Sequence, residues 1–306
     1  MTFNNQAAMT RRAFGRLALA TSGALLATSL AGCPSAPSGP TRETGFANVN
    51  GTRLYYEMSG RGDTVIFVHG FTLDTRMWDD QFDTFARRYR TIRYDARGFG
   101  KSAGVTGPFS IRDDLRALMD HLNVREAHIV GLSMGGRYAI DFTLNYPERV
   151  KSLVAVDAAL GGFPAPNVAR DIVRAIGAAK GGNMAEAKRI WLAHDLFKPA
   201  AEQPAVAARL QTMVADYNGW HFVNGPGMHE EAINPLASNR LGEIRKPTLV
   251  VVGSREVPEL LAAADKIAKE VPGARKAIIP NVGHMSNMEA PAAFHRIVLD
   301  HLATVK

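Results

Sequence analysis

Short apolar runs alternate with helix-like segments along this chain of 306 residues, and this alternation constrains its fold most strongly. Residues 64–68 form an almost unbroken apolar run, which is typical of a strand buried on both faces of a sheet. Similar runs predict further strands at 91–94, 127–130, 153–156, 248–252 and 277–279. Helical spacing of apolar residues predicts helices between them, at 79–89, 111–122, 134–145, 260–270 and 291–302. The pattern predicts an α/β fold with a doubly wound, mostly parallel sheet.

The sheet is expected to begin with an antiparallel hairpin. Two strand-like segments, 46–50 and 53–57, flank the dipeptide Asn50-Gly51. This dipeptide readily adopts the positive φ angles of a two-residue turn. The first two strands should therefore pair with each other before the parallel part of the sheet starts.

Composition excludes several other classes of protein. Hydrophobic residues make up 46% of the chain and charged residues 21%, values typical of a globular protein rather than a disordered chain. The one cysteine, Cys33, has no partner for an intrachain disulfide, so a hydrophobic core must hold the fold together.

The first 32 residues have the features of an export signal. Arginines precede an apolar run from Leu17 to Gly32, and no acidic residue occurs before Glu43. The segment Thr10-Arg11-Arg12-Ala13-Phe14 resembles the twin-arginine export motif, although Gly15 replaces the usual leucine. Leu30-Ala31-Gly32-Cys33 resembles a bacterial lipobox, in which cleavage leaves an acylated Cys33 at the N-terminus. The alternatives are a plain cleaved signal or an uncleaved anchor.

The resemblance implies export and a lipid anchor on the periplasmic or outer face of a bacterial membrane. Residues 33–45 would then be the lipidated cysteine and a linker rich in Pro, Ser and Gly, and 46–306 the folded domain. Removal of Arg11, Arg12 and Arg16 lowers the formal charge from +7 to +4. The remaining basic residues are scattered, which argues against nucleic acid as a partner.

One stretch, about 160–235, interrupts the alternation. It is rich in alanine, contains two of the three tryptophans and shows no convincing strand. We interpret it as a helical cap over the carboxyl edge of the sheet, where ligands bind in such folds. The alternative is a set of packing helices with no role in substrate access.

A Gly-x-Ser-x-Gly motif stands between a predicted strand and a predicted helix, in the segment Ile129-Val130-Gly131-Leu132-Ser133-Met134-Gly135-Gly136. In this context the glycines allow a sharp turn that projects the serine hydroxyl above the sheet. Ser133 is therefore the candidate nucleophile. A serine needs a base within hydrogen-bond reach before it can attack.

His284 is the candidate base among nine histidines. It follows the last predicted strand and precedes the last predicted helix, so it belongs to the same sheet edge as Ser133. Four histidines on helices or at strand starts are better explained as packing or surface residues: His121, His128, His295 and His301. Three more lie in the predicted cap: His194, His221 and His229.

With these features the chain resembles the α/β-hydrolase superfamily over about residues 46–304. The segment His69-Gly70-Phe71 resembles the family's oxyanion loop, and 95–102 resembles its Asp-x-Arg-Gly-x-Gly-x-Ser loop. Gly283-His284, followed by Glu289 and Pro291, resembles its histidine loop. The most similar members are capped enol-lactonases, esterases and cofactor-free haloperoxidase-like hydrolases.

The third member of the catalytic triad has two candidates. Glu256 lies three residues after the glycine that ends a strand, where the family usually has Asp, and the neighbouring Arg255 offers it an alternative partner. Asp157, just past the preceding sheet strand, is the rival. We favour Glu256. Either carboxylate would orient the imidazole and stabilise its protonated form.

The resemblance implies hydrolysis of a carboxylic ester or lactone through an acyl-enzyme, with an oxyanion hole from the N–H groups of Phe71 and Met134. A serine at position 133 excludes the displacement at saturated carbon that an aspartate performs. Neither a metal nor a cofactor is implied, and His229-Glu230-Glu231 is interpreted as a solvated turn. Apolar candidates for the substrate pocket are Trp220 and Met285, with Phe222 and Met288.

Two other functions stay open at this point. The same triad supports perhydrolysis or hydrolysis of a carbon–carbon bond. A binding or receptor protein with the hydrolase fold and little turnover is the alternative outside catalysis. Intact Ser133 and His284 count against it, and the unusual Glu256 counts slightly in its favour.

Overall fold

The computed structural model describes residues 41–225 and 229–305. The predicted signal of residues 1–32, Cys33 and most of the predicted linker lie outside the described residues. The linker was expected to extend to residue 45, but strand β1 already begins at Glu43. Its last residues are therefore part of the sheet.

An eight-stranded sheet forms the centre of the domain, in the order β1-β2-β4-β3-β5-β6-β7-β8. Strands β1 and β2 are antiparallel to their neighbours, and β3 to β8 pair in parallel. The predicted fold class is thereby confirmed. The strands are β1 (Glu43–Val49), β2 (Thr52–Ser59), β3 (Thr64–Val68), β4 (Arg90–Tyr94), β5 (Ala127–Leu132), β6 (Val150–Val156), β7 (Thr248–Gly253) and β8 (Arg275–Ile279).

The opening hairpin has the predicted turn. Val49 pairs with Thr52, and the two residues between them, Asn50 and Gly51, have φ angles of 45° and 67°. Positive φ at both central positions defines the turn that matches the twist of the flanking strands. The dipeptide thus sets the register of β1 against β2.

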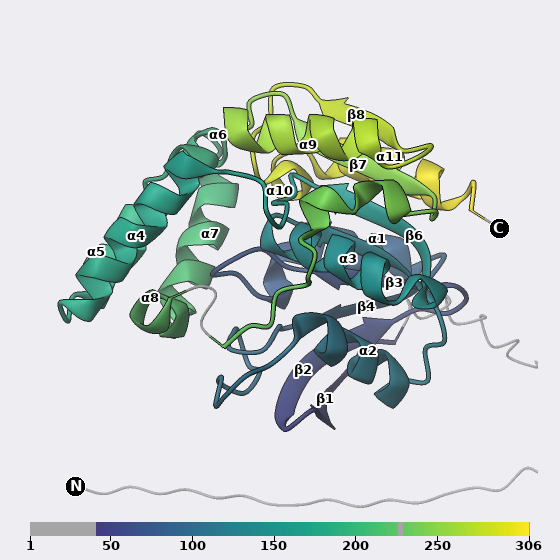
Figure 1. Ribbon diagram of the computed structural model, residues 1–306, viewed down its shortest axis with the longest axis horizontal. Helices are drawn as coiled ribbons and strands as arrows, with labels where there is room; N and C mark the ends of the chain where they lie inside the picture. Colours follow the sequence, from purple (N-terminus) through teal and green to yellow (C-terminus); the bar gives the residue numbers. More distant parts are fainter. Residues whose placement is uncertain (1–40, 226–228, 306) are drawn as a thin grey trace, which may run out of the picture. The chain divides into compact units, whose positions relative to one another are not determined.

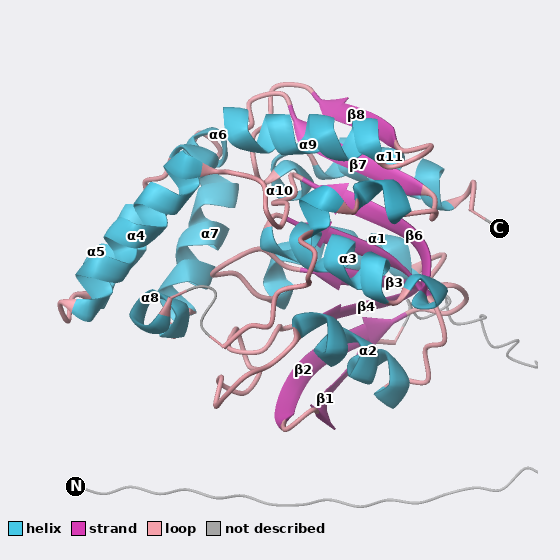
Figure 2. Ribbon diagram, in the orientation of Figure 1, coloured by secondary structure: helices cyan, strands magenta, loops and turns pink. Residues whose placement is uncertain are grey.

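Helices cover both faces of the sheet (Figures 1 and 2). Helix α1 packs with α11, and α2 packs with α3. At the start of α2, the Ser110 hydroxyl accepts a hydrogen bond from the Asp113 N–H, as the capping-box sequence predicts. These helices are α1 (Asp79–Ala86), α2 (Ile111–His121), α3 (Met134–Asn145), α9 (Pro258–Glu270) and α11 (Pro291–Leu302). The short helices that were not predicted include η1 (Thr75–Trp78) and α10 (Ser286–Glu289).

The described residues between β6 and β7 form helices and connecting loops and contribute no strand to the sheet. Figure 1 shows the helices labelled α4 to α8 gathered beyond one end of the sheet, and we refer to residues 160–235 as the cap. Its helices are α4 (Pro166–Lys180), α5 (Met184–Leu192), α6 (Lys198–Ala201), α7 (Pro204–Asp216) and α8 (Trp220–Asn224). Within the described ranges, no helix combines the length and the apolar character that a membrane span requires.

The loop at 95–102 follows strand β4 and is hydrogen-bonded to strand β2 of the hairpin and to η1. The Asp95 carboxylate accepts hydrogen bonds from the N–H groups of Thr75 and Lys101. A Cβ on Gly100 would lie 2.2 Å from that carboxylate, so only glycine fits beside it. Ser102 accepts a hydrogen bond from the Tyr55 N–H and donates one to the Asp95 carbonyl. The motif therefore supports the loops around the site.

Candidate active site

Ser133 lies at a strained turn between β5 and α3. Its φ and ψ are 59° and −117°, an unusual conformation for a residue other than glycine. The backbone is so close at this turn that a Cβ on Gly131 would lie 2.1 Å from the Gly135 carbonyl oxygen. A Cβ on Gly135 would lie 2.2 Å from the Val68 carbonyl oxygen. The glycines of the motif are needed for this close approach.

Two backbone N–H groups lie where the resemblance places an oxyanion hole. Met134 is the first residue of α3, so its N–H has no partner within the helix. A Cβ on Gly70 would lie 3.6 Å from the Ser133 Cβ, which places the loop after β3 directly against Ser133. In the described part of the chain, the Phe71 N–H donates to no other group. Both donors are thus available to a ligand.

Hydrogen bonds fix this loop from the sheet and from the cap. The His69 ring bonds the Gly70 carbonyl through Nδ1 (2.8 Å), and its Nε2 accepts from the Ala96 N–H (3.0 Å). Thr72 donates to the Phe71 carbonyl and accepts a hydrogen bond of 2.8 Å from Trp191 Nε1 on α5. The cap therefore helps to hold the peptide next to the candidate oxyanion donor.

The structure brings Glu256 to His284. His284 Nδ1 lies 2.5 Å from Glu256 Oε2, and both side chains are buried. The other carboxylate oxygen accepts the Val257 N–H at 2.7 Å. Arg255, the alternative partner for Glu256, instead pairs with Glu202 at the surface. An imidazole that donates from Nδ1 has Nε2 free to accept a proton.

Asp157, the rival acid, has other partners. Its carboxylate accepts hydrogen bonds from the Gly253 N–H at 2.8 Å and the Ser286 hydroxyl at 2.5 Å. Burial and the neighbouring Glu256 carboxylate raise the pKa of Asp157 well above its ordinary value. Asp157 thus ties the loops after β6, β7 and β8 together without contacting the imidazole through a hydrogen bond.

A third carboxylate, that of Glu289, holds the histidine loop. It accepts hydrogen bonds from the N–H groups of Gly283 (2.8 Å) and Met285 (3.0 Å), the residues on either side of His284. Burial raises the pKa of Glu289. The sequence indicated Glu289 only as part of a resemblance, and the structure shows what it contacts.

Ser133 opens into a cavity of about 310 Å³ beneath the cap. The cavity walls include both candidate oxyanion residues and side chains from α3, α4 and α5. They are Phe71, Ser133, Met134, Arg137, Tyr138, Ala159, Ala165, Val168, Ile172, Trp191, Leu196, Glu230 and Leu260. Most are apolar, as expected for a small-molecule site.

The predicted pocket residues Trp220 and Met285 are not in this cavity wall. Met285 is fully buried in the core beneath the histidine loop, as is Met288, while Trp220 begins α8 and packs against His221 and His229. This is a correction: Met285 belongs to the core, as large apolar residues near a site more often do, and Trp220 packs within the cap instead.

Trp191 is the cap tryptophan that lines the cavity, and nothing in its sequence surroundings distinguished it from Trp220. Arg137 was also missed, although its position four residues after Ser133 on a predicted helix was a usable signal. Residues four apart on a helix share one face.

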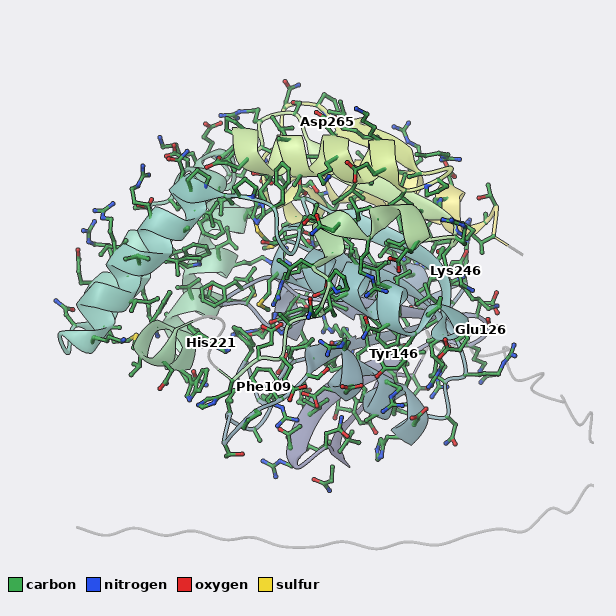
Figure 3. All side chains as sticks on the ribbon, in the orientation of Figure 1. Phe109, Glu126, Tyr146, His221, Lys246 and Asp265 are labelled. Carbon is green, nitrogen blue, oxygen red and sulfur yellow. The ribbon has the colours of Figure 1, made fainter. Side chains whose placement is uncertain are left out.

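Glu230 corrects a further prediction. It was expected in a solvated turn, yet its side chain is only 8% exposed and forms an ion pair with Arg137 at 2.7 Å. Phe109, labelled in Figure 3, holds this segment by donating to the His229 carbonyl and accepting from the Glu231 N–H. Glu230 is therefore part of the cavity wall, while His229 and Glu231 on either side of it are exposed, as expected for the turn.

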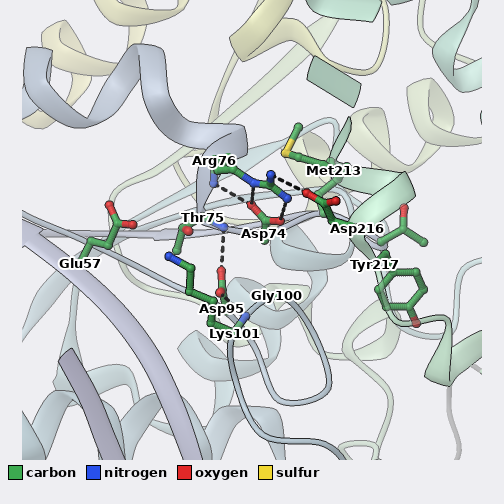
Figure 4. Close-up of a pocket in the computed structure, with 12 residues that line it drawn as sticks. Glu57, Asp74, Thr75, Arg76, Asp95, Gly100, Lys101, Met213, Asp216 and Tyr217 are labelled. Carbon is green, nitrogen blue, oxygen red and sulfur yellow. Dashed lines mark hydrogen bonds and ion pairs between the residues drawn. The ribbon is translucent and has the colours of Figure 1, made fainter. Parts of the chain in front are cut away.

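A second cavity, of about 350 Å³, lies on the other side of the oxyanion loop, between that loop, the 95–102 loop and cap helix α7 (Figure 4). Most of its lining residues are polar or charged, and three of the charged ones are paired with one another. Arg76 bonds Asp74 at 2.6 Å and Asp216 of α7 at 2.8 Å. This cavity does not contain Ser133, and its ion pairs join the cap to the body of the domain.

The remaining histidines have structural partners or deep burial. Burial lowers the pKa of His128, His221 and His301 to about 4 in each case, so these rings are neutral near pH 7. His128 bonds Ser152, and His221 bonds Tyr217. Among the described residues, no group of three or more potential ligands is arranged to hold a metal ion.

Comparison with known proteins agrees with this geometry. A family model described as the alpha/beta hydrolase fold matches residues 63–291. The chain therefore belongs to the alpha/beta hydrolase family, and the relatives described below are named as hydrolases, lactonases or esterases.

Two curated relatives are each 30% identical to this chain and cover 82% of it. One is named "Putative carbamate hydrolase RutD", from Caulobacter sp. (strain K31), of which 96% is covered. The other is a 2-hydroxy-6-oxononadienedioate/2-hydroxy-6-oxononatrienedioate hydrolase from Paraburkholderia xenovorans (strain LB400), of which 91% is covered. Their names describe different reactions, so likeness alone does not select one.

Two solved structures, each 25% identical, are similar over nearly their whole length. The enol-lactonase from Burkholderia xenovorans LB400 gives a TM-score of 0.74, with 85% of this chain and 100% of that one covered. A thermophilic esterase from Thermogutta terrifontis gives 0.75, with 86% and 98% covered. Both names agree with the class of hydrolase that the sequence resembles.

Proposed function

We propose that this protein is a serine hydrolase that cleaves a carboxylic ester or lactone through an acyl-enzyme intermediate. The observation that carries the proposal is the arrangement at the carboxyl edge of the sheet. Ser133 opens into an apolar cavity between two free backbone N–H groups, while Glu256 holds His284 on the loop after β8. The similarity to an enol-lactonase and an esterase supports the same reaction class.

The proposed first step forms an acyl-enzyme. The Ser133 oxygen attacks the carbonyl carbon as its proton passes to Nε2 of His284, and the carbonyl π electrons move to oxygen. The N–H groups of Phe71 and Met134 stabilise the resulting oxyanion, a contribution of about 10²–10³ in rate per donor. When the carbonyl reforms, the carbon–oxygen bond to the leaving group breaks and the alkoxide takes the proton from His284.

The second step releases the acid. His284 removes a proton from water, the hydroxide attacks the acyl carbon, and Ser133 leaves with the proton returned by the imidazole. In the described structure His284 bonds Glu256 and has no hydrogen bond to Ser133. Such bonds are often long in unliganded enzymes and tighten in the substrate complex.

The direct test is Ser133→Ala in the full-length protein. We expect the wild type to react with a fluorophosphonate probe and to hydrolyse short p-nitrophenyl esters. The variant should not be labelled, and its kcat/KM should be at least about 10⁴-fold lower than that of the wild type. A folded wild type that neither labels nor turns over these esters or simple lactones would contradict the proposal and favour a binding protein with a hydrolase fold.

Hydrolysis of a carbon–carbon bond is the second candidate, because a relative with 30% identity is named for a 2-hydroxy-6-oxononadienedioate substrate. A screen of vinylogous diketones of that type against esters and lactones separates the two reactions. The ester proposal requires kcat/KM for the best ester or lactone to exceed that for every diketone.

We also propose that the protein is exported and anchored by a lipid on Cys33. The carrying observation is the position of the single cysteine directly after Leu30-Ala31-Gly32 and an apolar run. Bacteria that express the protein, fed an alkyne analogue of palmitate, should label the wild type and not Cys33→Ser. Equal labelling of the two would contradict lipidation at this residue.

A further inference from the structure

The substrate cavity carries a charge pair in an otherwise apolar wall. Of its lining side chains, Arg137 and Glu230 are the charged ones. Both Glu230 oxygens lie 2.7 Å from Arg137 Nη2, and the two side chains are 24% and 8% exposed. The proposed hydrolysis uses neither group. A charge pair placed in such a wall has a strong influence on which substrates fit.

The pair lies in the same cavity wall as Ser133. Arg137 follows Ser133 by four residues on α3, and its N–H donates to the Ser133 carbonyl at 3.1 Å. The Cα atoms of the two residues are therefore about one helical turn apart, ~5.4 Å, and both side chains line the cavity. A linear acyl group attached to Ser133 brings its fifth carbon to about this distance.

The guanidinium keeps donors for a ligand. Arginine has five N–H donors, and the pair with Glu230 occupies those on Nη2. The Tyr138 ring packs against the guanidinium, 4.6 Å from its carbon to the ring centroid. The donors on Nε and Nη1 remain for Tyr138 and for an acceptor that enters the cavity.

The charge of Arg137 is already compensated. Glu230 is held in place by backbone hydrogen bonds between its neighbours and Phe109. A second carboxylate, Asp141, lies one further turn along α3, and burial raises its pKa to about 6, so it is charged at pH 8. The guanidinium is thus hydrogen-bonded to one carboxylate, and Asp141 adds a second negative charge on the same helix. A substrate carboxylate that entered here would lose its hydration and would find no unpaired cation to compensate that loss.

We propose that the Arg137–Glu230 pair selects the acyl group of the substrate by charge: it donates to an uncharged oxygen near the fifth acyl carbon and excludes a carboxylate there. This inference rests on the proposed ester or lactone hydrolysis and names its substrate class. Glu230 acts as the specificity residue because it neutralises an arginine that would otherwise attract anions.

Three p-nitrophenyl esters of nearly equal shape test the proposal at pH 8. They are the hexanoate, the 5-oxohexanoate and the monoester of glutaric acid. The acyl chain ends in an apolar group in the first, carries an uncharged carbonyl acceptor in the second and ends in a carboxylate in the third. For the wild type we expect kcat/KM to fall in the order 5-oxohexanoate, hexanoate, glutarate, with the last at least about 10-fold below the hexanoate.

Glu230→Gln should raise the ratio of kcat/KM for glutarate over hexanoate at least about 10-fold, because Arg137 then loses the carboxylate that is hydrogen-bonded to it. Arg137→Met should abolish the preference for 5-oxohexanoate over hexanoate. Glu231→Gln is the matched control, since this neighbouring glutamate is exposed, and it should leave both ratios within about twofold of wild type.

A folded Glu230→Gln variant with an unchanged glutarate ratio would overturn the inference. If that variant does not fold, the double variant Arg137→Met/Glu230→Leu removes both charges, and it should lose the 5-oxohexanoate preference without gaining glutarate hydrolysis. Retention of the preference there would also overturn it.

Failure of the proposed function has a different signature, in which no ester shows hydrolysis that depends on Ser133. The selection is then measured by thermal shift on Ser133→Ala with ethyl 5-oxohexanoate and monoethyl glutarate. The neutral ester should give the larger rise in Tm, and Glu230→Gln should reverse the order. Equal shifts for both ligands in both proteins would overturn the inference.

Discussion

The loops at the carboxyl edge of the sheet and the cap above them are held by different kinds of contact. Around His284, buried carboxylates accept backbone N–H groups: Glu289 holds the residues on either side of the histidine, and Asp157 holds the loops after β7 and β8. The cap is joined to the body by buried ring contacts, such as those of Phe71 with Trp191 and Phe222, and by ion pairs near the surface, such as Arg76–Asp216, Arg209–Asp80 and Arg255–Glu202.

This difference has an energetic meaning. A buried carboxylate that loses its donors is left unsolvated, at a cost of several kcal/mol. An exposed ion pair is worth about 0–1 kcal/mol because water and salt screen it. The proposed chemistry therefore depends on parts that cannot move without breaking strong buried contacts. The surface ion pairs of the cap, in contrast, are contacts that are easy to replace.

Replacing the carboxylate that is hydrogen-bonded to His284 should have the largest effect on catalysis. Glu256→Gln is expected to lower kcat for ester hydrolysis by about 10³–10⁴, because an amide no longer selects the productive tautomer or stabilises the imidazolium. Asp157→Asn, measured in the same assay, should lower kcat less than about 10-fold, since Asp157 contacts Ser286 and Gly253 instead. The reverse order would make Asp157 the triad acid.

Loosening the histidine loop should have a smaller effect on the same reaction. Glu289→Gln replaces one of two accepting oxygens by a donor, so the N–H of Gly283 or Met285 loses its partner. We expect kcat to fall about 10–100-fold, with a parallel fall in the rate of fluorophosphonate labelling. Glu270→Gln, an exposed change on α9, serves as control. Equal rates in the two variants would show that the hydrogen bonds that Glu289 accepts from the histidine loop are not needed for catalysis.

A buried acid beside the cavity should make stability depend on pH. Asp141 lies on α3, its Oδ1 has no hydrogen-bond partner, and burial raises its pKa from 3.8 to about 6. The folded state then binds more protons than the unfolded state between these values, so stability falls as pH rises from about 4 to about 6. Above that window the loss is up to about 3 kcal/mol.

Asp141→Asn removes this loss. Thermal unfolding should show a higher Tm for the variant than for wild type at pH 8, and a much smaller difference at pH 4.5. Asp265→Asn is the control because this aspartate is exposed and pairs with Lys276. It should change Tm by less than about 2 °C at either pH. A variant whose Tm equals that of wild type at pH 8 would contradict the assignment of this penalty to Asp141.

The sheet edge was largely predictable from sequence, and the cap was not. Ser133 stands in a motif whose glycines are required by close backbone contacts. Glu256 follows a strand that is almost entirely apolar, and His284 follows one that ends in three apolar residues. Chain position alone places such residues at one edge of a parallel sheet.

The cavity wall depends on contacts between segments far apart in the chain. Trp191 and Trp220 are both cap tryptophans, and only packing decides that the first bonds Thr72 and lines the cavity. Glu230 was expected in solvent because its neighbours are polar, yet Arg137, 93 residues earlier, pairs with it. The role of Asp157 was left open for the same reason, since its partner Ser286 is 129 residues away.

One arginine allows the two kinds of contact to be compared directly. Arg76 bonds Asp74 in the body, whose side chain is 9% exposed, and Asp216 in the cap, whose side chain is 59% exposed. Asp74 also accepts the Arg76 N–H at the start of η1. The two aspartates therefore test burial against exposure with the same partner.

Asp216→Asn should lower the free energy of unfolding in urea by less than about 1 kcal/mol, and the difference should vanish in 1 M salt. Asp74→Asn should lower the free energy of unfolding by about 1–3 kcal/mol, also in 1 M salt. It weakens the hydrogen bond that the buried Asp74 accepts from the first turn of η1 as well as the ion pair. Ester hydrolysis by Asp216→Asn should stay within about twofold of wild type, since Ser133 and the oxyanion loop keep their own contacts. If instead Asp216→Asn proves the more damaging change, the cap is joined to the body more rigidly than its exposed ion pairs imply, and the contrast between the two regions fails.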